Sequence, residues 1–138
     1  MPDAFALDPR LAADTLPLGS LKLCEVLLFN DSRFPWLILV PARAGLVEIV
    51  DLIEEDRALL MQEVSLTSEA LQKLTNCHKL NVAALGNQVR QLHVHVIARF
   101  EADAAWPNPV WGRGERVPYS AAAATLLKQQ IQTAMRLR

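Results

Sequence analysis

The chain has 138 residues, of which 51% are hydrophobic and 21% are charged, and its formal net charge at pH 7 is −1. This length suits one domain with a substantial core, and the composition is that of an ordinary globular protein. The charge balance offers no basic excess for a nucleic acid polymer, and the longest apolar runs are too short to span a membrane. We therefore expect one domain over residues 1–138 that binds neither nucleic acid polymers nor membranes.

The N-terminus and the cysteines bear on the compartment. The first residues lack the basic start and apolar core of a secretory signal peptide. Cys24 and Cys77 are two lone cysteines without the spacing of metal ligands. These features predict reduced thiols in a cytoplasmic protein.

The chain is expected to begin with a short helix. Asp8 has the residue type of a helix N-cap and Pro9 that of a first helical position, so the helix should run to about Asp14. Pro17 and Gly19 follow, and both residue types interrupt regular structure. We expect them to break the chain.

A hairpin is predicted next. Leu21–Phe29 and Trp36–Val40 are strand-like segments rich in aliphatic residues. The polar sequence Asn30-Asp31-Ser32 lies between them and has the composition of a turn. Two strands joined by a short polar turn indicate an antiparallel pair.

The segment from about Asp51 to Thr75 predicts the longest helix. Its apolar residues recur at helical spacing and form one stripe, which consists of Leu60, Val64, Leu71 and Leu74. The polar residues Glu63, Glu69, Gln72 and Lys73 are expected outside this stripe. Asp51 and Glu54 have the spacing of a capping box, and Asn76 is expected to end the helix.

The last part of the chain predicts a second hairpin and a final helix. Lys79–Leu85 and Val89–Phe100 are strand-like, and Gly86-Asn87 between them is expected to form the turn. Ser120 is expected to cap a C-terminal helix, Ala121–Arg138. Because strands and helices come in blocks and do not alternate strictly, the pattern indicates the α+β class with an antiparallel sheet.

Two of the three histidines, His93 and His95, lie one residue apart in the aliphatic sequence VRQLHVHVIARF. Side chains alternate across a strand, so Gln91 is expected on the same face as both histidines. The opposite face would consist of the core residues Leu92, Val94 and Val96. Imidazole is the side chain that changes between a neutral nucleophile and a charged acid near neutral pH.

The residues alone leave three interpretations of this polar face. The histidines can lie on a solvent-facing surface without a role, which three polar groups in a row disfavour. They can bind a metal ion, but this needs a third ligand: His78 lies across a predicted turn and has no defined place, and Glu101 is six residues further along the strand, too distant. They can act in covalent catalysis, in which one imidazole attacks phosphorus and a neighbour handles protons or phosphate charge.

The segment Gln91-Leu92-His93-Val94-His95-Val96-Ile97 resembles the signature of the histidine triad (HIT) family, His-φ-His-φ-His-φ-φ, in which φ is apolar. Gln91 stands at the first histidine position. The resemblance covers roughly residues 20–112, with both hairpins and the long helix, and looks closest to the bacterial branch of short HIT proteins. It implies a HIT-like α+β fold with an antiparallel sheet of about five strands, one long central helix and a C-terminal helix.

The resemblance also implies a function. HIT proteins are nucleotide hydrolases and nucleotidyl transferases, and the substrate here would be a nucleoside phosphate, dinucleoside polyphosphate or nucleoside phosphoramidate. His93 matches the nucleophile that forms a nucleotidyl-histidine intermediate, and His95 matches the histidine that orients and neutralises the phosphate. Gln91 can donate and accept hydrogen bonds but cannot relay a proton as imidazole does. No metal or other cofactor is expected, because the nucleophile is a nitrogen of the protein.

Further residues correspond to substrate contacts in the family. Asn87 and Gln88 match phosphate contacts, although an ordinary turn explains Gly86-Asn87 and exposure to water explains Gln88 equally well. Asn30 and Asp31 end a strand where family members place a polar group on the ribose, and a plain turn is about as common there. Trp36 stands where many members have another histidine, and core packing is expected for it.

The resemblance implies a homodimer, because HIT proteins commonly pair with the irregular C-terminal segment near the partner's active site. Trp111 in this segment is therefore expected to contribute to substrate binding. Two alternatives to an enzyme stay open. One is a nucleotide-binding protein that has lost turnover, with Gln91 as the mark of the loss. The other is a metal-binding protein that uses His93 and His95.

Overall fold

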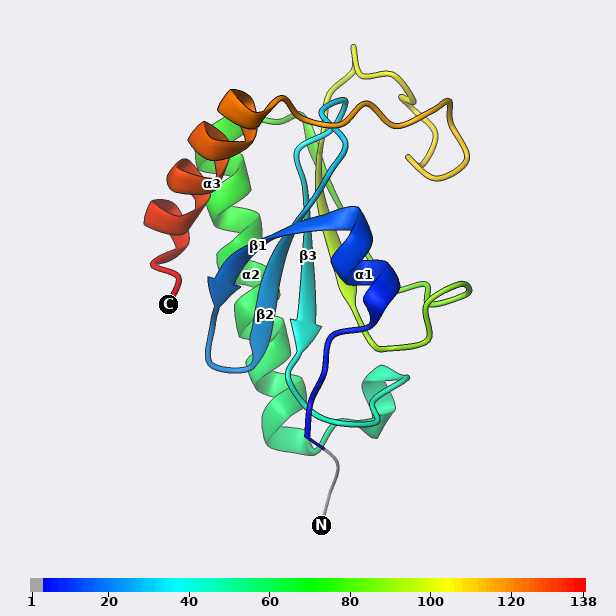
Figure 1. Ribbon diagram of the computed structural model, residues 1–138, viewed down its shortest axis with the longest axis vertical. Helices are drawn as coiled ribbons and strands as arrows, with labels where there is room; N and C mark the ends of the chain where they lie inside the picture. The colour runs from blue at the N-terminus through cyan, green and yellow to red at the C-terminus, as the bar shows by residue number, and fades with distance from the viewer. Residues whose placement is uncertain (1–3) are drawn as a thin grey trace.

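A five-stranded antiparallel sheet organises residues 4–138, the part of the chain that the computed structural model describes (Figure 1). The strand order is β1-β2-β3-β5-β4. The strands are β1 (Thr15–Ser20), β2 (Cys24–Phe29), β3 (Trp36–Pro41), β4 (Lys79–Ala83) and β5 (Val94–Arg99). The helices are α1 (Pro9–Asp14), α2 (Glu54–Thr75), α3 (Ala121–Met135) and a 3-10 turn at Ile49–Asp51. The predicted α+β class, with five strands, a long central helix and a C-terminal helix, is confirmed.

The short helix α1 forms as predicted from its first two residue types. The side chain of Asp8 accepts a hydrogen bond from the backbone N–H of Arg10 at 2.8 Å, so it caps the helix. Pro9 occupies the first helical position, where its missing N–H costs nothing. The helix lies on the sheet face opposite α2 and α3 (Figure 1).

Strand β1 is a correction, because we expected Pro17 and Gly19 to break the chain there. The segment instead pairs with β2 at the edge of the sheet, where a proline without an N–H is tolerated. The register shifts between Pro17 and Gly19, and Gly19 has φ +135°, a conformation that suits glycine. At the end of β1, Ser20 and Arg138 exchange two backbone hydrogen bonds, of 2.8 and 3.1 Å.

The first hairpin is confirmed, while the second differs from its prediction. Strands β2 and β3 pair from Cys24↔Pro41 to Leu28↔Leu37. Strands β4 and β5 are joined by a loop over residues 84–93, not by a two-residue turn at Gly86-Asn87, and β5 begins only at Val94. The reason is tertiary: the N–H of Leu92 donates to the carbonyl of Leu46 and not to β4.

Helix α2 covers one face of the sheet and ends as predicted, with Asn76 in the left-handed conformation at φ 51°. Leu60 and Leu71 are buried against the sheet, but Leu74 is 37% exposed and does not belong to the buried stripe. The predicted capping box is also wrong. Asp51 accepts from the backbone N–H of Glu48 at 2.8 Å, in the 3-10 turn that precedes the helix.

Helix α3 begins as predicted, because the Ser120 hydroxyl accepts from the backbone N–H of Ala123 at 3.2 Å. It ends at Met135 and not at Arg138, since Arg136 adopts the left-handed conformation. The last residues then turn to the edge of β1. Ile131 and Met135 are the buried residues of this helix.

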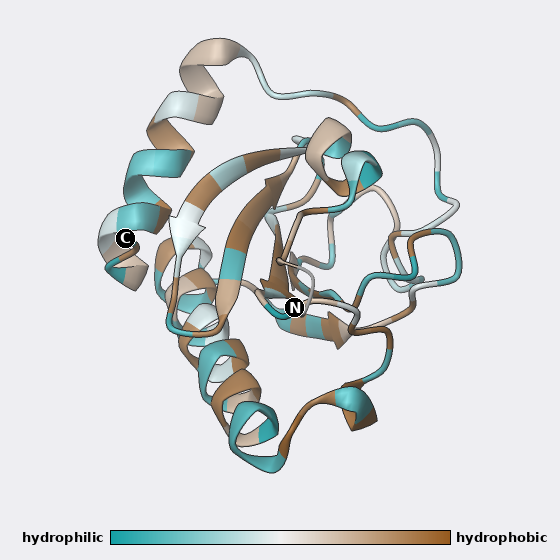
Figure 2. Cartoon of the chain, turned by 60° about the horizontal axis from the view of Figure 1, so that its bottom comes forward, coloured by the Kyte–Doolittle hydropathy of each residue, from teal (hydrophilic) through white to brown (hydrophobic). Residues whose placement is uncertain are grey.

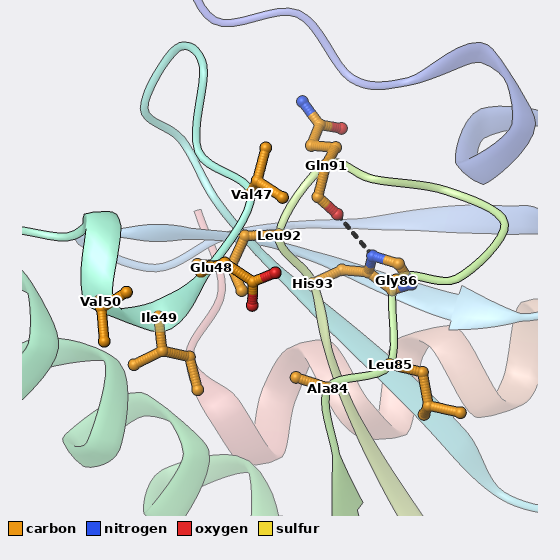
Figure 3. Close-up of a pocket in the computed structure, with 10 residues that line it drawn as sticks. All are labelled: Val47, Glu48, Ile49, Val50, Ala84, Leu85, Gly86, Gln91, Leu92 and His93. Atoms are coloured by element: carbon orange, nitrogen blue, oxygen red, sulfur yellow. Dashed lines mark hydrogen bonds between the residues drawn. The ribbon is translucent and has the colours of Figure 1, made fainter.

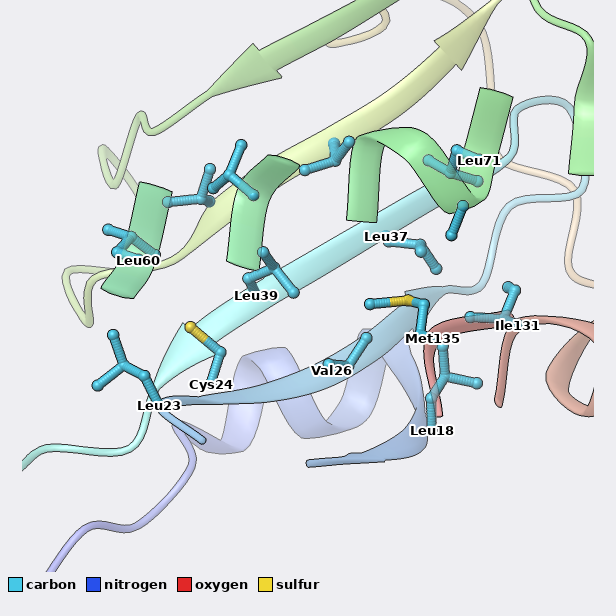
Figure 4. Close-up of a cluster of buried hydrophobic side chains, with 14 of the residues drawn as sticks. Leu18, Leu23, Cys24, Val26, Leu37, Leu39, Leu60, Leu71, Ile131 and Met135 are labelled. Carbon is cyan, nitrogen blue, oxygen red and sulfur yellow. The ribbon is translucent and has the colours of Figure 1, made fainter. Parts of the chain in front are cut away.

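Two hydrophobic cores form, one on each face of the sheet. Side chains of α2 and α3 meet the strands on one face, where Leu71 lies opposite Leu37, and Met135 lies beside Val26 (Figure 4). The central strands are mainly hydrophobic, whereas α2 shows alternating hydrophobic and hydrophilic bands (Figure 2). The second core lies under α1 and contains Phe34 and Trp36. No helix of residues 4–138 is long and apolar enough to cross a membrane.

Candidate functional site

His93 and His95 lie together on the sheet face that α2 does not cover. His93 is the last loop residue before β5, and His95 is the second residue of that strand. Their ring centroids are 4.9 Å apart, and each residue is 6% exposed. The neighbouring Leu92, Val94 and Val96 belong to the opposite core, so the predicted alternation of side chains holds across residues 92–96.

The ring of His93 is held by the backbone. Its Nδ1 atom lies 2.7 Å from the backbone carbonyl oxygen of Gln91, as Figure 3 shows. A carbonyl oxygen only accepts hydrogen bonds, so Nδ1 carries the proton in this contact. The Nε2 atom then keeps its lone pair, which is the form of imidazole that attacks an electrophile.

The side chain of Gln91 does not share a strand face with the histidines, contrary to our expectation. Its residue precedes β5, and its amide points away from His93 (Figure 3). The Oε1 atom accepts from the N–H of Asp8 at 2.8 Å, and the Nε2 atom donates to the carbonyl of Ala6 at 2.8 Å. The amide therefore fastens the N-terminal segment that leads into α1.

His95 contacts Trp36, a residue for which we expected only core packing. Trp36 is 4% exposed and belongs to the second core, but its indole Nε1–H also donates to Nδ1 of His95 at 2.9 Å. Burial and the neighbouring His93 lower the pKa of His95 to about 3. Strand parity is the signal that could have revealed this contact, because Ile38 is paired with His95 and lies on the same face as Trp36.

A cavity of about 360 Å³ opens beside the two histidines, within the size range of small-molecule sites. It brings together several predicted site residues: His93, His95, Asn87, Gln88 and Trp111. Phe29 and Trp36 add aromatic surface, and Leu11 and Asp14 of α1 form part of the wall. Aromatic faces of this kind can stack on a nucleobase.

Trp111 forms its contacts within its own chain. Its ring centroid lies 5.0 Å from that of His95 and 5.6 Å from that of Trp36, with edge-to-face geometry in both pairs. The resemblance to the HIT family implied a place near the active site of a partner. In this structure it lines the cavity of the chain that carries it.

A smaller cavity of about 220 Å³ lies on another side of His93 (Figure 3). Its wall is mainly apolar and includes Val47, Ile49 and Leu85, together with the carboxylate of Glu48. His93 therefore borders two cavities. The larger one also contains His95 and the aromatic rings, so it is the one that combines the chemical groups of the candidate site.

Asn30 and Asp31 do not line either cavity. The Asn30 side-chain oxygen accepts from the N–H of Tyr119 at 2.9 Å. Asp31 is 1% exposed and accepts from the guanidinium of Arg33 at 2.8 Å and from the N–H of Val117 at 3.2 Å. Burial raises the pKa of Asp31, but the hydrogen bonds from Arg33 and Val117 outweigh it and hold the pKa below its usual value. Both side chains fasten the C-terminal segment to the first hairpin.

A third metal ligand is not found near the histidine pair. Among residues 4–138, no three His, Cys, Asp or Glu side chains are grouped closely enough to hold a metal ion. His78 instead lies 3.5 Å from a carboxylate oxygen of Glu101 and packs against the edge of Trp106. The metal-binding interpretation therefore has His93 and His95 as ligands but no third ligand among the described residues.

Comparison with known proteins identifies a family and several similar structures. A family model described as the HIT domain matches residues 11–102. The structure is similar to that of a histidine triad protein from Bradyrhizobium japonicum, with 47% identity, a TM-score of 0.95 and coverage of 96% of this chain and 99% of that one. It is also similar to a histidine triad (HIT) protein from Sinorhizobium meliloti, with 48% identity, a TM-score of 0.92 and coverage of 94% and 96%. No curated protein matches the chain significantly.

Proposed function

The chain belongs to the HIT-domain family, and from this premise we propose that it is a nucleotide hydrolase or nucleotidyl transferase that works through His93. The substrate would be a nucleoside phosphate, a dinucleoside polyphosphate or a nucleoside phosphoramidate. The observation that carries the proposal is the 2.7 Å contact between Nδ1 of His93 and the carbonyl of Gln91, which leaves a lone pair on Nε2 at the cavity.

The proposed reaction has two steps. In the first, Nε2 of His93 attacks the α-phosphorus, a nitrogen–phosphorus bond forms, and the bond from phosphorus to the leaving group breaks. The leaving group departs with a proton taken from water or from a neighbouring donor. In the second, water or another acceptor attacks phosphorus and releases a proton to the solvent, the nitrogen–phosphorus bond breaks, and His93 returns to its neutral form.

The remaining site residues would bind and orient the substrate. His95, Asn87 and Gln88 offer hydrogen-bond donors for phosphate oxygens, and charge that develops on phosphate is stabilised by donors aimed at it. Trp111 would supply a ring face for the nucleobase. Gln91 would act indirectly, because its amide holds the segment that leads into the cavity wall at α1.

Replacing the nucleophile tests this proposal. We expect His93→Ala to lower kcat/KM by at least about 10³-fold and to abolish trapping of labelled nucleotide on the protein, because no other side chain takes the place of Nε2. The measurement is hydrolysis of adenosine phosphoramidate and of diadenosine polyphosphates. His78→Ala is the matched control, since His78 is exposed and packs against Trp106, outside the cavity.

Two results would contradict the proposed enzyme. Wild-type turnover by His93→Ala would exclude the covalent mechanism. Binding of AMP by the wild-type protein, without turnover of any substrate in the panel, would instead identify a nucleotide-binding protein that has lost the reaction.

We also propose that the chain acts as a single-domain cytoplasmic homodimer. Both cysteines are free, which suits a reducing compartment. Strand β4 ends the sheet, and within residues 4–138 no strand pairs with its outer side. Val82 on β4 is 49% exposed and Leu85 after it is 46% exposed, so this edge offers both hydrogen-bonding groups and apolar surface to a second copy.

A further inference from the structure

The two histidines of the site are held by partners of opposite character. Nδ1 of His93 faces a backbone carbonyl, which only accepts hydrogen bonds. Nδ1 of His95 faces the indole N–H of Trp36, which only donates. The same ring atom therefore carries a proton in His93 and a lone pair in His95. In both rings Nδ1 is occupied within the protein, and Nε2 is left for the substrate.

We propose that Trp36 is a positioning residue that holds His95 in the tautomer with its proton on Nε2, so that His95 meets the phosphate as a neutral hydrogen-bond donor. The inference deepens the proposed function and rests on it. The two adjacent rings then have different roles. Nε2 of His93 attacks phosphorus with its lone pair, while Nε2–H of His95 donates to a phosphate oxygen.

The packing of Trp36 makes this arrangement difficult to reverse. The indole stacks on Phe29 with ring centroids 4.2 Å apart and meets the edges of Phe34 and Trp111 at 6.4 and 5.6 Å. Its residue is 4% exposed, in a strand whose six residues are all buried. A proton on Nδ1 of His95 would face the indole N–H at 2.9 Å, so two donors would oppose each other with no acceptor between them.

The charges around His95 also favour its neutral form. His93 lies just before β5, two residues from His95, and if it were protonated it would disfavour a second positive charge 4.9 Å away. Asp14 of α1 lines the same cavity, but it is paired with Arg116 at 3.1 Å. The residues that pair with His95 from β3 and β4 are Ile38 and Ala83, which carry no charge. Burial is the larger cause and, together with His93, lowers the pKa of His95 to about 3.

Trp36→Phe tests the inference, because it keeps an aromatic ring and removes the donor. Long-range proton–nitrogen NMR spectra of the resting protein report the protonation of each imidazole nitrogen. For the wild type we expect His95 to show a bare Nδ1 and a protonated Nε2 from pH 8 down to about pH 4. For Trp36→Phe we expect Nδ1-protonated and doubly protonated forms to appear at higher pH. Trp106→Phe is the matched control, since this indole packs on His78.

The pH dependence of kcat/KM gives a second readout that a purely structural role would not move. The acid limb that protonation of the nucleophile His93 imposes is common to all variants; Trp36→Phe should change the profile further where His95 begins to titrate, whereas Trp106→Phe should match the wild type. A folded Trp36→Phe with the wild-type spectrum and pH profile would overturn the inference. A wild-type spectrum with the His95 proton on Nδ1 would overturn it without any variant.

The two proposals fail in different experiments. The NMR spectrum of the resting protein does not require turnover, so absence of hydrolysis together with the expected spectrum would refute the enzyme and leave the tautomer assignment standing. Hydrolysis through His93 together with a proton on Nδ1 of His95 would refute the role of Trp36 and leave the enzyme standing.

Discussion

Gln91 contributes to the site through two separate parts of the residue. Its backbone carbonyl orients His93, and its side-chain amide joins the N-terminal segment at Ala6 and Asp8. Any residue at this position keeps the carbonyl. The tautomer of His93 therefore does not depend on whether the side chain at position 91 is glutamine or histidine, because the backbone carbonyl of either residue can accept from Nδ1.

We expect Gln91→His to leave kcat unchanged within about threefold, because the backbone carbonyl stays in place. KM should rise by about 3- to 10-fold, because the two-point amide contact to Ala6 and Asp8 is lost, and each hydrogen bond contributes about 1 kcal/mol. Steady-state kinetics on the substrate that turns over best provides both values. Gln129→His, on the exposed side of α3, is the control. A large increase in kcat would show that the side chain at this position limits the chemistry.

At the scale of elements, Glu63 joins α2 to the start of β2. The sequence placed it outside the buried stripe, yet it is 4% exposed. Its two carboxylate oxygens accept from the backbone N–H groups of Leu23 and Cys24, both at 2.9 Å. Burial and the nearby carboxylate raise the pKa of the Cys24 thiol. A charged residue is thus buried because it satisfies backbone donors that no neighbouring strand reaches.

We predict that Glu63→Ala lowers the free energy of unfolding by about 2–4 kcal/mol, because two buried N–H groups lose their acceptor. Chemical denaturation at pH 7 measures this difference. Glu69→Ala removes an exposed carboxylate from the same helix and should change the free energy by less than about 0.5 kcal/mol. Equal effects of the two substitutions would show that the contacts to Leu23 and Cys24 do not stabilise the fold.

At the scale of the whole molecule, the two faces of the sheet are used differently. One face is closed by α2 and α3 and carries the larger hydrophobic core (Figure 4). The other face carries the smaller core, the histidines and the cavity. The edges differ as well, because β1 is bonded to the C-terminal residue while β4 ends the sheet.

The open edge of β4 leads to a prediction about assembly. We expect the protein to have the mass of a dimer in solution, and Val82→Lys to shift it toward the monomer, because a charged side chain on an edge strand opposes pairing. Light scattering after size exclusion gives the mass. Leu126→Lys changes a residue of α3 with 58% exposure and should leave the mass unchanged. If the wild-type protein has the mass of one chain at all concentrations, the predicted dimer is wrong.

Local sequence patterns predicted the elements that are specified by residues close together in the chain. Helices α1 and α2, the first hairpin and the start of α3 are confirmed, because caps, apolar spacing and turn residues act within a few positions of each other. Strand β1 was missed because Pro17 and Gly19 indicate a break, and only its place at the sheet edge makes them compatible with a strand. The beginning of β5 was missed because Leu92 donates its backbone hydrogen bond to Leu46.

The sequence by itself determined the class of fold, the position of the histidine pair and the likeness to the HIT family, because these are carried by contiguous residues. Tertiary structure alone decided which hydrogen-bond partner each histidine ring has. Trp36 and His95 are 59 residues apart in the chain, and strand register brings their ring nitrogens to 2.9 Å. The proton on an imidazole is set by the partner of its other nitrogen, and such a partner is chosen by packing between distant segments, which no local pattern encodes.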